Sequence, residues 1–238
     1  MGKWSYTLSK WKYGYTTIDF AHLKQLKKKY IRVSNLSFTS KHQNHLSNHQ
    51  EIEEISNYVL PFVNLANLFL DNKEINESDL SALLNYFQRA PFEKITAWHY
   101  KQCYDEVLKR SLHSDCLKKI DIRGRVWSQD LQDGIQEFIL TKPVRHVDCK
   151  DTNLVFDRAF FEGIFELNPS ERRFYFNLPF SFPFESLKNF KKELQDTSDT
   201  ASVWTHLVWK RKDDGVQIDV TDCGKMNTRS LCIRLSQN

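Results

Sequence analysis

The sequence "RHVDCK" places an imidazole, a carboxylate and a thiol close together, at His146, Asp148 and Cys149. A base, an orienting acid and a nucleophile are the groups that acyl-transfer enzymes combine. The segment alternates like a β-strand, however, and neighbouring side chains of a strand point to opposite faces of the sheet. We therefore expect His146 and Asp148 to share one face and Cys149 to point into the core with Val147. No catalytic residue is predicted here.

A second cluster, in "KHQNHLSNHQ", holds His42, His45 and His49. On a helix these imidazoles would share one side and could bind zinc. Loop-forming Asn and Ser residues surround them, and no cysteine or carboxylate stands nearby at ligand spacing, so we expect a solvated loop, no metal and no cofactor. A metal-dependent hydrolase that uses these histidines is the alternative.

Basic residues gather in "HLKQLKKKY", at Lys24, Lys27, Lys28 and Lys29. They could contact phosphate groups, which makes a weak nucleic-acid binder a further alternative. Aromatic and basic residues do not interleave beyond this point, so a solvated helix face is the expected reading. The sequence also lacks a Gly-rich phosphate loop, a GxSxG turn and an HExxH motif, and we expect no enzyme.

Composition indicates an ordinary globular protein: 238 residues, 40% hydrophobic, 13% aromatic and a net charge of +4. No run is long enough for a signal peptide or a membrane span, so we expect a soluble protein in the cytoplasm or the nucleus. The five cysteines show no CxxC spacing, which predicts reduced thiols and no zinc knuckle.

Five nine-residue segments resemble the strand of a leucine-rich repeat, with apolar residues at the fourth and sixth positions. They are LANLFLDNK from Leu65, FEKITAWHY from Phe92, LKKIDIRGR from Leu117, VRHVDCKDT from Val144 and ERRFYFNLP from Glu171. Their starts are 27, 25, 27 and 27 residues apart. VSNLSFTSK from Val33 fits as an earlier unit with an insertion. The asparagine that true leucine-rich repeats carry at the ninth position is absent, which predicts a less regular arc.

Stretches with helical spacing follow the strand segments. Their apolar positions are Leu80, Leu83, Leu84 and Phe87, then Leu131, Ile135, Phe138 and Ile139, and near the end Leu187, Phe190 and Leu194. Ser78 and Ser128 stand where helix N-caps would fall, and Pro91, Pro143 and Pro169 stand just before the next strand.

The predicted fold is therefore α/β: a leucine-rich-repeat-like βα solenoid with a parallel sheet. "VWTHLVWKR", "VQIDVT" and "SLCIRLS" alternate as strands and predict a C-terminal antiparallel three-stranded meander. We divide the chain into an N-terminal cap or remnant segment (1–29), the βα repeats (30–196) and the antiparallel β cap (197–238).

The register also predicts a binding face. If the fourth and sixth strand residues point inward, the third, fifth and seventh point to the concave face of the sheet. The binding residues expected there are Trp98, Lys119, Asp121, Arg123, His146, Asp148, Arg173 and Tyr175. Trp, Tyr and Arg dominate protein interfaces, so the expected function is a non-enzymatic scaffold for protein–protein interaction. The alternative is an ordinary polar sheet face, with Trp98 or Phe69 covered by the chain ends.

"DFAHLKQLKKKYIRVSNLSF", the imperfect repeats and "VWKRKDDGVQIDV" together resemble a nematode-expanded group of F-box and F-box-associated proteins. The resemblance extends from about Trp11 onward. It implies substrate recognition in a ubiquitin ligase, with an F-box holding a Skp-type adaptor. No LP-led run of helical hydrophobic residues precedes Tyr30. We therefore expect a shortened relative or an F-box upstream of Met1, and a Skp-type partner only in the second case.

Overall fold

The computed structural model describes most of the central part of the chain and separate segments towards both ends. The described residues are 8–11, 15–18, 20–25, 27, 32–39, 49–71, 77–87, 90–98, 101–167, 174–183, 186, 194–196, 206–211, 216–222 and 230–236. Outside them lie His42 and His45, where a solvated loop was expected and zinc was the alternative, and the expected binding residue Arg173.

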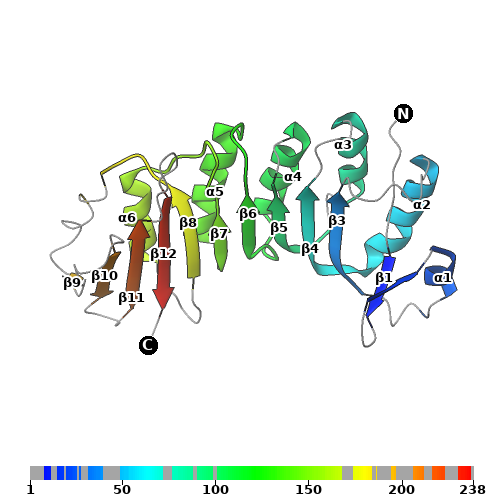
Figure 1. Cartoon of the computed structure of the whole chain (residues 1–238), viewed down its shortest axis with the longest axis horizontal. Coiled ribbons are helices and arrows are strands. Elements are labelled where there is room, and N and C mark those ends of the chain that lie inside the picture. Colours follow the sequence, from blue (N-terminus) through cyan, green and yellow to red (C-terminus); the bar gives the residue numbers. More distant parts are fainter. Residues whose placement is uncertain are drawn as a thin grey trace.

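Ten strands of the described residues form one mixed sheet, in the order β3-β4-β5-β6-β7-β8-β12-β11-β10-β9 (Figure 1). Six strands run parallel in chain order: β3 (Val33–Thr39), β4 (Val63–Asp71), β5 (Phe92–Ala97), β6 (Lys119–Ile122), β7 (His146–Asp148) and β8 (Phe174–Pro179). Four continue antiparallel: β12 (Ser230–Ser236), β11 (Gln217–Asp222), β10 (His206–Arg211) and β9 (Leu194–Asp196). The mixed α/β class, parallel first and antiparallel at the C-terminus, is confirmed.

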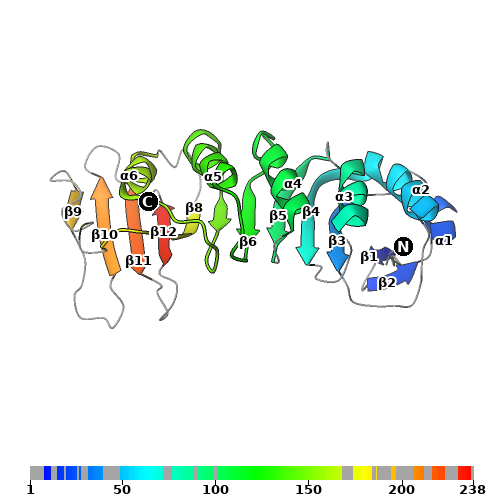
Figure 2. The ribbon, with the colours of Figure 1, turned by 90° about the horizontal axis from the view of Figure 1, so that it is seen from above.

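Five helices lie on one face of this sheet (Figure 2). They are α2 (His49–Val59), which runs into a short 3-10 turn at Leu60–Phe62, α3 (Glu77–Tyr86), α4 (Gln102–Leu112), α5 (Gln129–Thr141) and α6 (Arg158–Glu166). The opposite face of β4 to β8 carries none of these helices and is called the helix-free face. Near the N-terminus, β1 (Leu8–Trp11) and β2 (Tyr15–Ile18) form a separate antiparallel pair, followed by α1 (Phe20–Gln25).

Strand pairing confirms the repeat spacing except in the last unit. The paired core residues are Leu36 with Leu68, Leu68 with Ile95, Ile95 with Ile120, Ile120 with Val147, and Val147 with Phe176. The sequence pattern aligned Val147 with Phe174 instead, which is wrong by two residues. Phe176 and Leu178 are fully buried whereas Phe174 is not, so burial selects the later pair. A two-residue shift leaves every side chain on its expected face.

The core lies between the helices and the sheet. Alternate strand residues and one stripe of each helix fill it with side chains at most 2% exposed, among them Leu68, Leu70, Ile95, Ile120, Ile122, Val147, Phe176, Leu84, Leu108, Leu131, Ile135, Phe138, Phe161 and Ile164. Burying each large apolar side chain contributes about 1.5–3 kcal/mol, so this interface is the main source of stability. The apolar stripe predicted for the helix at 129–141 is confirmed in full.

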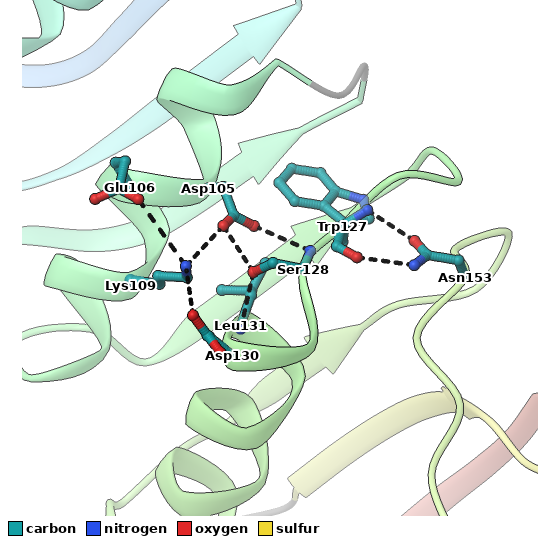
Figure 3. A network of polar contacts seen from close by, with 8 residues as sticks. All are labelled: Asp105, Glu106, Lys109, Trp127, Ser128, Asp130, Leu131 and Asn153. Carbon is teal, nitrogen blue, oxygen red and sulfur yellow. Dashed lines mark hydrogen bonds and ion pairs between the residues drawn. The ribbon is translucent and has the colours of Figure 1, made fainter.

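Buried polar contacts join the start of α4 to the start of α5 (Figure 3). Asp105, 4% exposed, accepts hydrogen bonds from the Oγ of Ser128 at 2.7 Å and from its backbone N–H at 3.4 Å. The Nζ of Lys109 lies 3.0 Å from the same carboxylate. Ser128 is the N-cap of α5, because its Oγ accepts from the N–H of Leu131 at 3.1 Å. The predicted N-cap is therefore confirmed.

Similar contacts join the neighbouring units. The Oε1 of Glu77, at the start of α3, accepts from the N–H of Cys103 at the start of α4, at 3.0 Å. Gln132, in the first turn of α5, donates to the backbone O of Val155 at 2.9 Å and accepts from its N–H at 3.0 Å, just before α6. Three successive units, those of α3, α4 and α5, thus each use a polar side chain near the helix N-terminus to contact the next unit.

Other expectations have mixed outcomes. The meander is confirmed, because β10, β11 and β12 pair antiparallel in that order. Ser78 is not an N-cap, since α3 begins at Glu77 and Ser78 lies in its first turn. Leu194 was predicted on a helix but lies in β9, which pairs with β10.

Within the part of the chain that the structure describes, no helix is long and apolar enough to cross a membrane.

Candidate functional site

The candidate site is the helix-free face over β5 to β8 and β12. Strand alternation builds it: the core residues of these strands point to the helices, so the residues between them point the other way. Pairing sets these residues in two rows across the strands. The inner row is Thr96, Asp121, Asp148, Asn177 and Cys232, and the cationic row is Lys94, Lys119, His146, Tyr175 and Arg234.

Arg123 joins the two carboxylates of the inner row. Its Nη2 lies 2.9 Å from the Oδ2 of Asp148, and its Nη1 lies 2.9 Å from the Oδ1 of Asp121. The same Nη1 donates to the backbone oxygens of Ile122, at 2.8 Å, and Asp148, at 3.2 Å. Both protons of Nη1 are therefore engaged, and its contact with Asp121 is an ion pair without a hydrogen bond.

The chain fixes this cluster on both sides. The backbone O of Arg123 accepts from the indole N–H of Trp127 at 3.2 Å, and the Oδ1 of Asp148 accepts from the N–H of Lys150 at 3.1 Å. Gly124 follows with φ 113°, a conformation that a side chain would strain, and donates its N–H to the O of Asp151 at 3.3 Å. Arg123 and its carboxylates are thus held before any ligand arrives.

Burial raises the pKa of Asp121. The positive charge of Arg123 lowers this pKa, and the negative charge of Asp148 raises it further. The Oδ1 of the neighbouring Asn177 is also buried and accepts no hydrogen bond among the described residues. The inner row is therefore poorly solvated, and the charge state of Asp121 depends on the neighbouring charges of Asp148 and Arg123.

Tyr175 is flanked on both sides in the cationic row. The ring of His146, on β7, stacks with it at 5.0 Å between centroids and 14° between planes. The guanidinium of Arg234, on β12, lies 5.9 Å from the centroid of the Tyr175 ring. The Tyr175 hydroxyl lies 3.0 Å from the Sγ of Cys232. Burial lowers the pKa of His146, and Lys94 and Lys119 lower it further against the opposing effect of Asp148 and Asp121.

The cations of this row are less engaged than Arg123. Among the residues that the structure describes, neither Lys94 nor Lys119 forms an ion pair, and Arg234 has only its contact with Tyr175. The side chain of Arg234 is exposed, and those of Lys94 and Lys119 are partly exposed. The row therefore presents three cations that form no ion pair with the described residues.

Trp98 lies at the end of β5 and is 44% exposed. Its ring meets that of Phe69 edge to face, with 5.1 Å between centroids. The described residues do not cover Trp98, so a large apolar side chain is exposed to solvent beside the charged rows.

The described residues of the predicted binding set thus share one face: Trp98, Lys119, Asp121, Arg123, His146, Asp148 and Tyr175. Sequence reasoning missed Arg234 and Cys232, which reach this face because β12 pairs with β8. Alternation in "SLCIRLS" places both on one side of that strand, but only the long-range pairing reveals which surface they join.

The structure does not bring His146, Asp148 and Cys149 together as a base, an orienting acid and a nucleophile. Cys149 is fully buried, and burial raises the pKa of its thiol well above the usual range. A protonated thiol in the core cannot act as a nucleophile towards a ligand on the face. Among the described residues, no group of three or more His, Cys, Asp or Glu could hold a metal ion.

Comparisons of the chain with family models, with curated proteins and with solved structures found no match. The argument about function therefore rests on the site itself.

Proposed function

We propose that the chain is a leucine-rich-repeat-like solenoid that acts as a non-enzymatic scaffold and binds a protein partner on its helix-free face. One observation carries this proposal. An exposed tryptophan, a flanked tyrosine and three cations that form no ion pair among the described residues lie on one sheet face. Rigid aromatic and Arg side chains are enriched among the residues that dominate binding energy at protein interfaces.

Two features support binding over catalysis. The contacts of Arg123 and Tyr175 hold the face in one arrangement, and preorganisation lowers the entropy lost on association. Cys149, the thiol next to Asp148 in the sequence, points to the opposite side of the sheet and is fully buried. The face therefore does not assemble the combination of imidazole, carboxylate and thiol that His146, Asp148 and Cys149 suggest in the sequence.

Quantitative affinity capture tests the proposal. Wild type is compared with Trp98→Ala/Tyr175→Ala, and with Val126→Ala/Val155→Ala as the matched control. Val126 and Val155 are 63% and 42% exposed and lie outside the two rows. Partners of the face should be recovered by wild type and the control and lost, by about tenfold or more, with the Trp98/Tyr175 variant. Equal recovery of every partner by all three folded proteins would refute the proposal.

The resemblance to F-box-associated proteins implies a ubiquitin-ligase setting, in which the bound partner would be a ubiquitination substrate. Mixing the purified chain with a purified Skp-type adaptor tests this extension separately. A stable complex in gel filtration would support it. Absence of a complex would remove the ligase role of this chain and leave the binding face untouched.

A further inference from the structure

The cationic row has a defined geometry that limits what can bind. Lys94, Lys119, His146, Tyr175 and Arg234 occupy five neighbouring strands in register. Strands in a sheet lie about 4.8 Å apart, so the row spans roughly 19 Å. An extended peptide advances about 3.3 Å per residue and would cover this distance with about six residues.

The charge of the row is complementary to carboxylates. The two acidic side chains of the adjacent inner row, Asp121 and Asp148, are both held by Arg123. On the next strand of the same row, Asp219 pairs in register with Arg234. It accepts from the Nε2 of Gln217 at 3.1 and 3.2 Å and forms no ion pair with Arg234 among the described residues. Lys94, Lys119 and Arg234 therefore face outward, and no acidic side chain of the described residues forms an ion pair with them.

From this charge complementarity we propose that the helix-free face binds an acidic peptide segment of its protein partner, whose carboxylates pair with Lys94, Lys119 and Arg234. The inference rests on the proposed function and adds the chemistry of the partner. Complementary charge across an interface mainly provides specificity and faster association.

A nucleic acid fits the same face less well. Proteins that bind single strands combine cations with free aromatic faces on which bases stack. Here His146 and Arg234 already flank the ring of Tyr175.

Selection from a random 12-residue peptide phage library on the full chain tests the inference. Synthetic versions of the enriched peptides, with Gln in place of each Asp and Glu as matched controls, are then titrated by fluorescence anisotropy against three proteins. These are wild type, Lys94→Glu/Lys119→Glu/Arg234→Glu, and Lys27→Glu/Arg110→Glu/Arg125→Glu. The last variant carries the same charge change at exposed positions away from the row.

We expect enrichment of Asp- and Glu-rich peptides, binding that weakens about tenfold or more in the row variant, and unchanged binding in the control variant. If the row variant does not fold, Lys94→Gln/Lys119→Gln/Arg234→Gln should show the same loss to a smaller degree. Equal binding of the acidic peptides to both charge variants would overturn the inference.

The remaining outcomes separate this inference from the proposed function. Enriched peptides without excess acid, whose binding requires Trp98 and Tyr175, would overturn the acidic partner and keep the binding face. No enrichment at all would overturn both. A labelled oligothymidine of twelve nucleotides serves as a parallel probe. Its binding, lost in the row variant while acidic peptides fail to bind, would assign the row to nucleic acid instead.

Discussion

Arg123 provides the counter-charge for the carboxylates of Asp148 and Asp121. The side chains of these two residues are only 10% and 19% exposed, respectively. Replacing Arg123 with Ala leaves both without a positive partner in poorly solvated positions. Breaking a fully buried ion pair costs about 3–5 kcal/mol, and the partial exposure here lowers our expectation to about 2–4 kcal/mol. Urea denaturation of Arg123→Ala against wild type measures the change in the free energy of unfolding.

Two further variants give this measurement its controls. Arg123→Lys keeps the charge but cannot span both carboxylates with a planar guanidinium, so an intermediate loss is expected. Arg125→Ala removes an exposed charge nearby and should change the free energy of unfolding by less than about 0.5 kcal/mol. If Arg123→Ala is as stable as wild type, the cluster contributes no net stability.

The lowered pKa of His146 predicts a pH dependence with a definite sign. In the unfolded chain His146 binds a proton near pH 6.5, whereas the folded protein resists protonation until a lower pH. Below about pH 6.5 the unfolded state therefore holds more protons, and the free energy of unfolding falls as the pH drops. This loss should be smaller in His146→Gln than in wild type, as urea midpoints at pH 7.5, 6.5, 5.5 and 5.0 would show.

The raised pKa of Asp121 acts in the opposite direction and at lower pH. Its folded state keeps a proton above pH 3.8, so the stability it contributes is fully present below that pH and is lost as the pH rises through its folded pKa. Both proteins contain Asp121, so the comparison above isolates His146 to a first approximation. Equal slopes for wild type and His146→Gln between pH 7.5 and 5.0 would contradict the prediction.

At the scale of elements, Asp105 determines how α4 meets α5. Asp105→Ala leaves the Ser128 hydroxyl and N–H without their acceptor and frees Lys109 from its buried partner. Charged hydrogen bonds contribute about 1.5–3 kcal/mol, and we expect a loss of about 2–3 kcal/mol in urea denaturation. Asp130 is the control, since it also pairs with Lys109, at 3.4 Å, but its side chain is 84% exposed. Asp130→Ala should lower stability by about 0.5 kcal/mol at most, and equal effects of the two substitutions would contradict a role for burial.

Two helix glycines occur at similar places in successive units and should respond differently to alanine. A Cβ on Gly163, in α6, would lie 3.1 Å from a side-chain carbon of Leu140, which is 39% exposed and able to move aside. A Cβ on Gly134, in α5, would lie 2.9 Å from Leu112, which is buried at 5% exposure. Alanine stabilises a helix interior by about 1 kcal/mol relative to glycine. We expect Gly163→Ala to raise the thermal unfolding midpoint and Gly134→Ala to give no gain, and a rise in both would mean that Leu112 also moves freely.

At the scale of the whole molecule, local patterns in the sequence predict the elements better than their long-range pairing. The two-residue alternation around Ile120 and the helical stripe at Leu131 and Ile135 depend on neighbours in the chain, and the structure confirms both. The register of β8 depends on the length of the connection before it, which the pattern does not fix. The contribution of β12 to the face depends on contacts between residues far apart in the chain. Cys232 lies 57 positions from Tyr175, whose hydroxyl it contacts, and Arg234, which pairs with Tyr175, lies 59 positions from it. Periodicity in the sequence therefore could not place Arg234 in the cationic row or Cys232 in the inner row.

That pairing makes β12 the link between the parallel and antiparallel parts of the sheet, and its removal should affect the whole molecule. Deleting residues 230–238 would remove the buried side chains of Leu231, Ile233 and Leu235 and leave β8 and β11 with unpaired edges. Exposed strand edges pair with other chains, so we expect association at micromolar concentration in gel filtration with light scattering. Deleting only 237–238 keeps β12 and is the matched control, for which the elution of the full chain is expected. A monomeric 230–238 deletion with an unchanged circular dichroism spectrum would show that the parallel strands and their helices form a stable unit without the antiparallel end.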